Sequence, residues 1–301
     1  MPLRHDVRRG AILMLGATAF FTIMSALVKE ATARLPVAEL MFFRSALALP
    51  VVMVIVFRSG NWTLLRTKRF PGHMLRACTG TAAMTCGYFS LTVLPLAEQT
   101  ALSYTTPLFV TLLSIPFLGE KVGVHRWTAV LGGFAGIVVI ALGQGAFQAE
   151  GQGGASSLLV IGTIVAVSNG VFSALTTLLV RGLSATESST TIVMWQSLLM
   201  TAITSLALPF VWVTPTGMEW LLLIGVGLFG ALGQVMLTEA YASAQVSSIG
   251  PYSYSSMLWS IALGWLMWGD VPGTTTVAGA VLIVAAGLYI LHRELIRRRQ
   301  P

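Results

Sequence analysis

Uninterrupted apolar runs, separated by short polar segments, fill almost the whole chain. Ten runs can be distinguished, at about residues 11–29, 37–57, 74–93, 97–117, 127–143, 157–180, 189–212, 219–240, 246–267 and 274–292. A helix that crosses a bilayer needs roughly 20 apolar residues. None of the runs alternates over about 10 residues, as the strands of an outer-membrane barrel do. The pattern predicts an all-α integral membrane protein with ten transmembrane helices.

A faint internal repeat relates two of these runs. Residues 90–120 align with residues 240–270, which places Ser103-Tyr104-Thr105-Thr106 opposite Ser253-Tyr254-Ser255-Ser256. Gly119-Glu120 and Gly269-Asp270 occupy matching positions near the ends of the two copies. Few residues are identical, so the interpretation rests on the shared order of an apolar run, a glycine followed by an acid, and a second apolar run. A membrane chain that repeats itself is typical of transporters, whose site lies between the repeats.

One segment has the composition of a linker. Residues 143–157 read GQGAFQAEGQGGASS and are rich in Gly, Gln and Ser. They divide the chain into a first repeat at residues 1–143, an extracytoplasmic linker at 144–156, and a second repeat at 157–301 that ends in a basic tail. Five spans per repeat is an odd number, so the second copy enters the membrane from the other side. We therefore predict two inverted five-helix repeats.

Charge fixes the predicted orientation. The chain is 55% hydrophobic and 10% charged, against about 25% charged in an ordinary soluble domain, and its net charge is +7. With a cytoplasmic N-terminus, only Lys29 and Arg34 fall on the outer side. The cytoplasmic side then holds Arg4, Arg8, Arg9, Arg58, Arg66, Lys68, Arg69, Arg76, Lys121, Arg126, Arg181, Arg293, Arg297, Arg298 and Arg299. This asymmetry follows the positive-inside rule. It predicts that both termini are cytoplasmic, and it explains the basic surplus without a nucleic-acid partner.

Three short motifs accompany the two Gly-acid pairs, namely Leu94-Pro95-Leu96-Ala97-Glu98, Pro107-Leu108-Phe109 and Leu131-Gly132-Gly133-Phe134-Ala135-Gly136. Together these motifs resemble those of the drug/metabolite transporter superfamily, EamA type. In the second copy Met257 replaces the proline equivalent to Pro107, so that copy matches less closely. The resemblance covers nearly the whole chain. It implies a ten-helix carrier in a bacterial inner membrane, similar to bacterial exporters of aromatic and other amino acids.

Inverted repeats place a substrate site near the midplane, where polar side chains are costly unless they face a cavity or a neighbouring helix. The predicted pathway consists of polar and aromatic residues within the spans, namely Tyr88, Ser103, Tyr104, Asn169, Gln234, Ser253, Tyr254 and Trp259. Tyr104 and Tyr254 are equivalent across the repeat. The alternative for the amides and hydroxyls is a hydrogen bond between helices, and for Trp259 it is contact with lipid.

Four further residues have predicted mechanical or electrostatic roles. Arg44 is the one basic residue well inside a span, and Glu39 lies five residues before it. We expect these two charges to pair, with capture of a substrate carboxylate by Arg44 as the alternative. Pro107 and Pro251 interrupt the fourth and ninth runs, where each removes a backbone hydrogen bond. They are candidate hinges for gating, or alternatively static bends.

The function predicted from these features is transport by alternating access. Few charges and several tyrosines and hydroxyls favour a small zwitterion or neutral solute, so we expect export of amino acids, aromatic and neutral ones included. The alternative is uptake of another metabolite, such as S-adenosylmethionine or riboflavin. An intramembrane enzyme is the remote alternative, because the histidines lie at termini, loops or span ends and no metal or nucleophile motif occurs. No metal or cofactor is expected. The expected partners are a small-molecule substrate and lipid, and the glycine face at Gly132 and Gly136 would permit a homodimer.

Overall fold

The chain folds as a bundle of helices. The computed structural model describes residues 7–60, 62–118, 124–143, 154–183, 186–243 and 250–299, and no strand occurs in these ranges. The first part of the chain forms α1 (Val7–Ala31), α2 (Val37–Ser59), the 3-10 helix η1 (Trp62–Leu65), α3 (Phe70–Val93), α4 (Leu96–Ser103), α5 (Thr106–Leu118) and α6 (Val124–Gly143). The second part forms α7 (Gly154–Leu183), α8 (Ser189–Ser205), α9 (Leu208–Val211), α10 (Gly217–Ser243), the 3-10 helix η2 (Gly250–Tyr254), α12 (Ser255–Trp268) and α13 (Thr274–Arg299).

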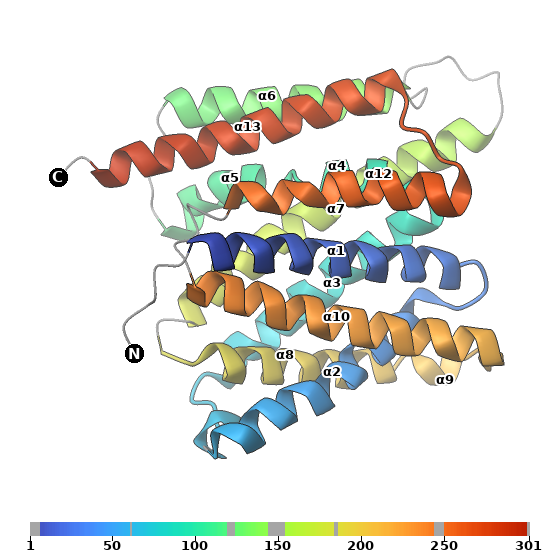
Figure 1. The fold of residues 1–301 in the computed structure, drawn as a ribbon, viewed down its shortest axis with the longest axis vertical. Coiled ribbons are helices and arrows are strands. Elements are labelled where there is room, and N and C mark those ends of the chain that lie inside the picture. Colours follow the sequence, from blue (N-terminus) through green and yellow to red (C-terminus); the bar gives the residue numbers. More distant parts are fainter. Residues whose placement is uncertain are drawn as a thin grey trace.

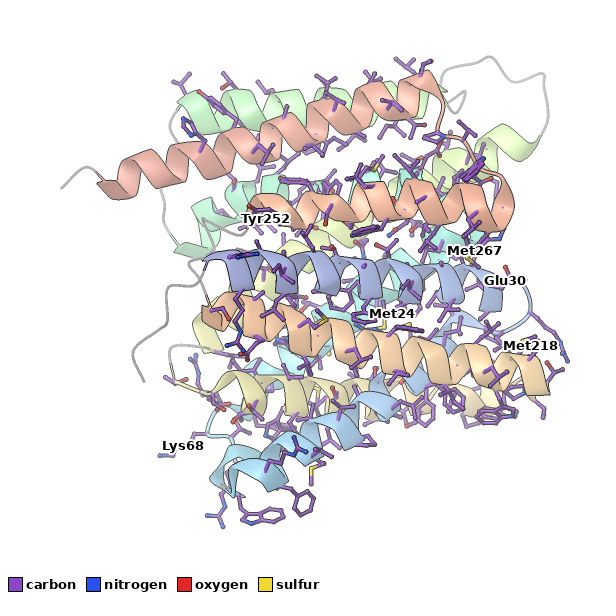
Figure 2. The ribbon with its side chains drawn as sticks, in the orientation of Figure 1. Met24, Glu30, Lys68, Met218, Tyr252 and Met267 are labelled. Carbon is purple, nitrogen blue, oxygen red and sulfur yellow. The ribbon has the colours of Figure 1, made fainter. Side chains whose placement is uncertain are left out.

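The helices lie side by side, and α1 begins at the same end of the bundle at which α13 finishes (Figure 1). We call this the terminal end and the other the opposite end. Figure 2 shows Lys68 at the terminal end, and Glu30 and Met267 at the opposite end. The orientation of these ends in a membrane remains a prediction from charge.

Each long helix of the first half packs against one of the second half. The most extensive contacts join α1 to α10, α3 to α7, α6 to α13 and α2 to α8, and α4 contacts α12. When the two halves are exchanged, the α1–α10 pair becomes the α7–α3 pair, while the α6–α13 and α2–α8 pairs map onto themselves. Two halves related by a two-fold axis would give this pattern of contacts.

Large apolar side chains cover much of the outside of the bundle. Phe210, Val124 and Leu266 expose 87%, 76% and 74% of their surface, and side chains of this kind would face lipid in a membrane. Within the described residues, four helical segments are long and apolar enough to span a bilayer, namely Arg8–Ala31, Val37–Arg58, Ser157–Val180 and Gly217–Leu237. Two shorter apolar helices are Val130–Gly143 and Thr274–Tyr289. The chain is thus a multi-pass membrane protein, and the count of ten spans stays a prediction.

The structure interrupts three runs that the sequence predicted as single spans. The run 97–117 is divided between α4 and α5, and the described part of 246–267 is divided between η2 and α12. Pro107 explains the first break, because a proline inside a helix would clash with the carbonyl four residues earlier, whereas it is tolerated in a first turn. The second helix accordingly begins at Thr106, one residue before Pro107. Pro251 lies in η2. The third interrupted run, 189–212, is divided between α8 and the short α9.

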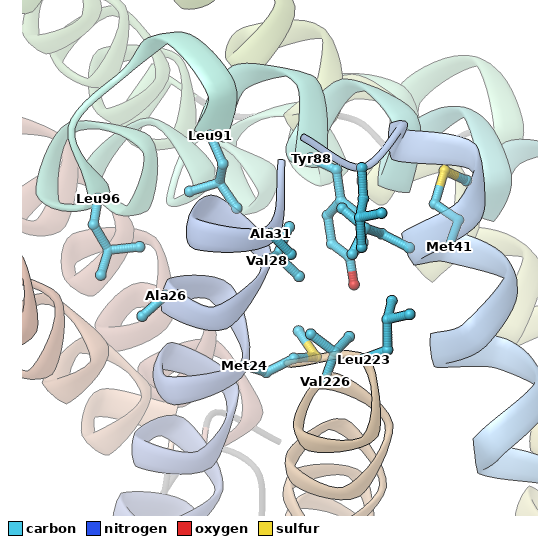
Figure 3. Packing of buried hydrophobic residues seen from close by; sticks show 12 residues of the cluster. Met24, Ala26, Val28, Ala31, Met41, Tyr88, Leu91, Leu96, Leu223 and Val226 are labelled. Atoms are coloured by element: carbon cyan, nitrogen blue, oxygen red, sulfur yellow. The ribbon is translucent and has the colours of Figure 1, made fainter. Parts of the chain in front are cut away.

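An apolar core fixes α1, α2, α3 and α10 relative to one another. It contains Met24 and Val28 of α1, Met41 of α2, Tyr88 of α3 and Leu223 of α10 (Figure 3). The Tyr88 ring lies between these helices and is only 6% exposed. This core positions the polar side chains that lie next to it on α2 and α10.

Candidate substrate pathway

A small polar cavity lies between α2, α8 and α10. Its polar lining comes from Arg44 and Ser45 of α2, Gln196 and Ser197 of α8, and Gln234 of α10. The cavity volume is about 40 Å³, which is enough for a few water molecules and well below the roughly 300 Å³ of the smallest ordinary ligand pockets. As it stands in the structure, this cavity is too small to hold a metabolite.

Arg44 is a half-buried cation that has no counter-ion among the described residues. Its Nε donates to the Met24 Sδ at 3.3 Å, and a thioether is a weak acceptor. Within the part of the chain that the structure describes, no carboxylate oxygen lies within ion-pair distance of its guanidinium. Gly230 of α10 makes room for the Met24 sulfur that accepts from Arg44, because a Cβ at that position would lie 2.9 Å from the Met24 Sδ.

Glu39 does not form the expected pair with Arg44. It is fully buried, and its Oε2 accepts a hydrogen bond from the Val213 backbone N–H at 3.2 Å, while Oε1 has no hydrogen-bond partner. The physical reason is helix geometry, since side chains three or four residues apart share a face but residues five apart do not. Glu39 thus joins α2 to the segment before α10. Arg44 does not pair with it and lines the cavity instead.

Tyr88 lies close to the cavity without lining it. Its hydroxyl points toward Leu223 and Val226 of α10 (Figure 3) and makes no hydrogen bond to any described residue. Of the predicted pathway residues, Gln234 lines the cavity together with Arg44, and Tyr88 lies beside it in the core that contains Met24.

Tyr104 and Tyr254 form a second group, at the two helix breaks. Their ring centroids are 4.9 Å apart at an interplanar angle of 63°. The Tyr104 hydroxyl donates to the Tyr254 carbonyl at 3.1 Å and shares a hydrogen bond with the Ser256 hydroxyl. The repeat-related tyrosines thus hold the α4–α5 break against the η2–α12 break, and Ser103 donates back to the carbonyl of Thr100 at 2.7 Å. Ser253 lies in η2, next to Tyr254.

Asn169 and Trp259 make contacts between helices. The Asn169 side chain of α7 donates to the Ala83 carbonyl of α3 at 2.6 Å. Gly87 permits this approach, since a Cβ there would lie 2.8 Å from the Asn169 Nδ2. The Trp259 Nε1 of α12 donates to the Thr18 hydroxyl of α1 at 3.3 Å, and 39% of this tryptophan is exposed. Neither residue lines the cavity in this conformation.

Polar contacts close the opposite end of the bundle. The Lys29 Nζ of α1 donates to the Leu94 carbonyl at 3.2 Å and to Asp270 Oδ2 at 3.3 Å, and it lies 4.7 Å from the centroid of the Trp268 ring. Asp270 is held in place by Gly269, which ends α12 in a left-handed conformation with φ of 71°. The matching first-half pair Gly119-Glu120 lies outside the described residues.

Separate contacts hold the terminal end. Arg9 of α1 pairs with Glu239 of α10 at 2.7 Å, with both side chains about half exposed. The His73 Nε2 of α3 contacts the Glu187 carboxylate, and these two side chains are almost fully buried. Burial alone would raise the pKa of Glu187, but hydrogen bonds from Thr67, His73 and the Lys68 backbone N–H outweigh it and hold this pKa below its usual value.

Sequence reasoning missed several members of these groups. Gln196 is a mid-span amide, so the criterion that selected Asn169 and Gln234 would also have selected it. Ser45 and Ser197 carry no such signal, because serine is common in transmembrane helices for packing reasons. The Lys29–Asp270 contact joins residues far apart in the chain and depends on how the two halves meet.

Comparison with known proteins decides the family. The sequence model of the EamA-like transporter family matches residues 8–142 and again residues 160–292. The chain belongs to the EamA-like transporter family. A crystal structure of a protein 21% identical to this transporter covers 97% of it, and 99% of that protein, with a TM-score of 0.63. The fold is therefore one already seen in a crystal.

Named relatives of this EamA-like transporter carry different solutes. A pseudopaline exporter of Pseudomonas aeruginosa is 32% identical, with 93% of this chain and 95% of the relative covered. A riboflavin transporter of Vibrio cholerae is 33% identical, over 100% of this chain and 98% of the relative. An S-adenosylmethionine uptake transporter of Rickettsia felis is 28% identical, over 87% and 85%. The relatives are all transporters, and they differ in both solute and direction.

Proposed function

We propose that this EamA-like transporter exports small solutes that carry a carboxylate, namely amino acids and compounds built from them, across a bacterial inner membrane. The observation that carries the proposal is Arg44, a cation that lines the cavity between α2, α8 and α10 and has no carboxylate partner among the described residues. A guanidinium presents a planar fork that matches a carboxylate. Gln196 and Gln234 supply amides that can hydrogen-bond to an amino group or a second polar group of the solute.

Alternating access would require each end of the bundle to open in turn. The Lys29–Asp270 contact closes the opposite end, and the Arg9–Glu239 and His73–Glu187 contacts close the terminal end. The breaks at Tyr104 and Tyr254 give α5 and α12 points about which they can tilt, with Pro107 and Pro251 as the hinge residues. The export direction is supported by the exporter that is 32% identical to this chain.

Uptake of a vitamin or nucleoside-type metabolite is the second candidate. It is favoured by the riboflavin transporter, which is 33% identical over the whole chain, and by the S-adenosylmethionine uptake transporter. Phe20 and Phe229, whose rings are stacked with centroids 5.6 Å apart, provide an aromatic surface between α1 and α10.

A transport assay with purified protein in liposomes separates the two candidates. Vesicles loaded with one unlabelled solute are challenged with labelled amino acids, riboflavin and S-adenosylmethionine. We expect saturable counterflow of at least one amino acid and little counterflow of its carboxamide analogue, which lacks the negative charge. Counterflow of riboflavin or S-adenosylmethionine, with none of any amino acid, would replace the first candidate by the second.

Breaking the closure at the opposite end should change transport. Lys29→Asp places a carboxylate beside Asp270 and removes the donor to Leu94, so we expect about a ten-fold change in the counterflow rate, as suits the loss of a partly buried charged hydrogen bond. The exchange Lys29→Asp with Asp270→Lys should recover much of the rate. Arg9→Gln, at the half-exposed pair with Glu239, is the matched control and should change the rate less than about five-fold. Equal effects of the two single substitutions would refute a specific role for Lys29.

A further inference from the structure

A second arginine, Arg76 of α3, is more deeply buried than Arg44. Only 7% of the residue is exposed, and neither its Nε nor its Nη1 makes a hydrogen bond to any described residue. A buried charge without a partner costs several kcal/mol, and proteins normally pair such charges or give them a ligand. Arg76 therefore needs an anion that the described part of the chain does not supply.

The carboxylate that contacts His73 already accepts hydrogen bonds from other donors. Glu187 Oε2 contacts the His73 Nε2, and Glu187 Oε1 accepts from the Thr67 hydroxyl and from the Lys68 backbone N–H at 3.2 Å. Since His73 lies three residues before Arg76, the two side chains occupy the same side of α3. The structure thus places a carboxylate in the region of Arg76 and commits it to other donors.

Two more buried polar atoms, one on the same side of α3 and one on a residue packed against the core cluster that contains Ala77 of α3, are unpartnered among the described residues. They are the Nδ1 of His73, a residue that is 1% exposed, and the Nε1 of Trp195 on α8. The His73 and Trp195 rings contact each other, with centroids 6.1 Å apart. The indole N–H and the guanidinium are donors only, so the two groups share a requirement for an acceptor.

This cluster, made of Arg76, His73 and Trp195, lies between the terminal end and the cavity. Gly80 follows Arg76 by one helical turn toward the membrane interior, and a Cβ there would lie 3.9 Å from the Gln196 Nε2 and 3.7 Å from the Met200 Sδ. Gln196 and Met200 both line the cavity. The Gln196 side chain thus lies between the cavity and the α3 face that carries Arg76. It donates only a weak hydrogen bond, to the Met200 sulfur at 3.5 Å.

We propose that Arg76 and Trp195 form a second carboxylate-binding site, which receives the solute between the terminal end of the bundle and the Arg44 cavity. The planar guanidinium binds the two carboxylate oxygens side by side, and the indole N–H donates to one of them. Rotation of Gln196 then opens the way to Arg44. The identity of the solute in this assignment rests on the proposed function. The binding of a carboxylate by a buried arginine does not depend on it.

The test measures thermal unfolding of the purified protein in detergent, with succinate as the probe and sodium chloride at equal ionic strength as the reference. All variants carry Arg44→Gln, so that binding in the cavity does not contribute. We expect succinate to raise the unfolding midpoint of this parent by roughly 2–4 °C at saturating concentration. The rise should disappear when Arg76→Gln is added, and it should persist with Arg66→Gln, which removes an exposed arginine at the same end.

Three further outcomes complete the test. Without succinate, Arg76→Gln should leave the midpoint unchanged or higher, because it removes an uncompensated buried charge. Arg76→Lys keeps the charge without the fork and should weaken the apparent succinate affinity about ten-fold. A succinate response that survives Arg76→Gln, or that is absent from the parent, overturns the assignment. An equal rise with succinamide or with inorganic phosphate overturns its carboxylate specificity. Failure of amino-acid counterflow in liposomes, by contrast, refutes the proposed function and leaves this response unaffected.

Discussion

Arg44→Gln should lower counterflow of carboxylate-bearing solutes about 100-fold, because loss of a desolvated charge partner typically costs 2–5 kcal/mol. The structure gives Arg44 the cavity and no carboxylate of its own among the described residues. The effect should fall on the solute concentration at half-maximal rate more than on the maximal rate, since the contact is made in the bound state. The measurement is the initial rate of labelled amino-acid counterflow in liposomes over a range of concentrations.

The control for Arg44 comes from the same helix. Arg58 lies in the last turn of α2 and is exposed, so Arg58→Gln removes the same charge from the chain without touching the cavity. It should leave the counterflow rate within about two-fold, as most surface substitutions leave the protein unaffected. The carboxamide analogue provides a second control, since its residual transport should be insensitive to Arg44. If an amino acid and its amide lose transport equally in Arg44→Gln, the residue has a structural role and the proposed contact is refuted.

Gly136→Val should prevent correct packing of α6 against α13. A Cβ at Gly136 would lie 2.6 Å from the Gly279 carbonyl oxygen and 2.7 Å from the Ile283 Cγ1, both closer than any real Cβ contact. The oxygen belongs to the backbone, so the two helices would have to separate along their length. Overpacking of this kind costs typically 1–3 kcal/mol, occasionally more. We expect a sharply reduced yield of monodisperse protein in size-exclusion chromatography and a lower unfolding midpoint.

Gly132 is the matched control for Gly136. It lies one turn earlier on α6, and a Cβ there would meet no atom within 4 Å. Gly132→Val makes the same chemical change at the other glycine of the same motif and should leave yield and midpoint close to those of the parent protein. Equal losses in both variants would mean that β-branching within α6, rather than the α6–α13 contact, causes the effect. Gly136 packs against Gly279 and Ile283 of α13 within the chain. The homodimer that this glycine face would permit stays a prediction.

The sequence predicted the helical class and the family, because these depend on local hydropathy and short motifs. The apolar runs that became α1, α2, α7 and α10 needed only length and composition to be recognised. The interrupted run at Pro107 was visible as a proline within an apolar stretch, but the extent of the break was not, since it depends on how Tyr104 meets Tyr254 and Ser256. The division into residues 1–143 and 157–301 and the inverted orientation of the halves remain predictions.

The site was less accessible to sequence reasoning for a different reason. The search for polar residues near the middle of a span identified Gln234, which lines the cavity. It could not predict that Asn169 would donate to the Ala83 carbonyl instead of facing a cavity. Proximity in the chain suggested the Glu39–Arg44 pair, which helix geometry separates. Arg76 was counted only as one of many cytoplasmic charges, because its burial against α7 and α8 depends on contacts between the halves.

The way in which the two halves pack has a consequence for how the protein is made. The main partner of α1 is α10, and the main partner of α6 is α13, whereas contacts between helices of the same half are sparse. When only the first half has been synthesised and inserted into the membrane, its helices therefore lack their principal neighbours. Stable tertiary structure has to wait for the second half, and association over such sequence distances is slow and exposes intermediates. By the same reasoning, two separately synthesised halves should assemble with each other in preference to folding alone.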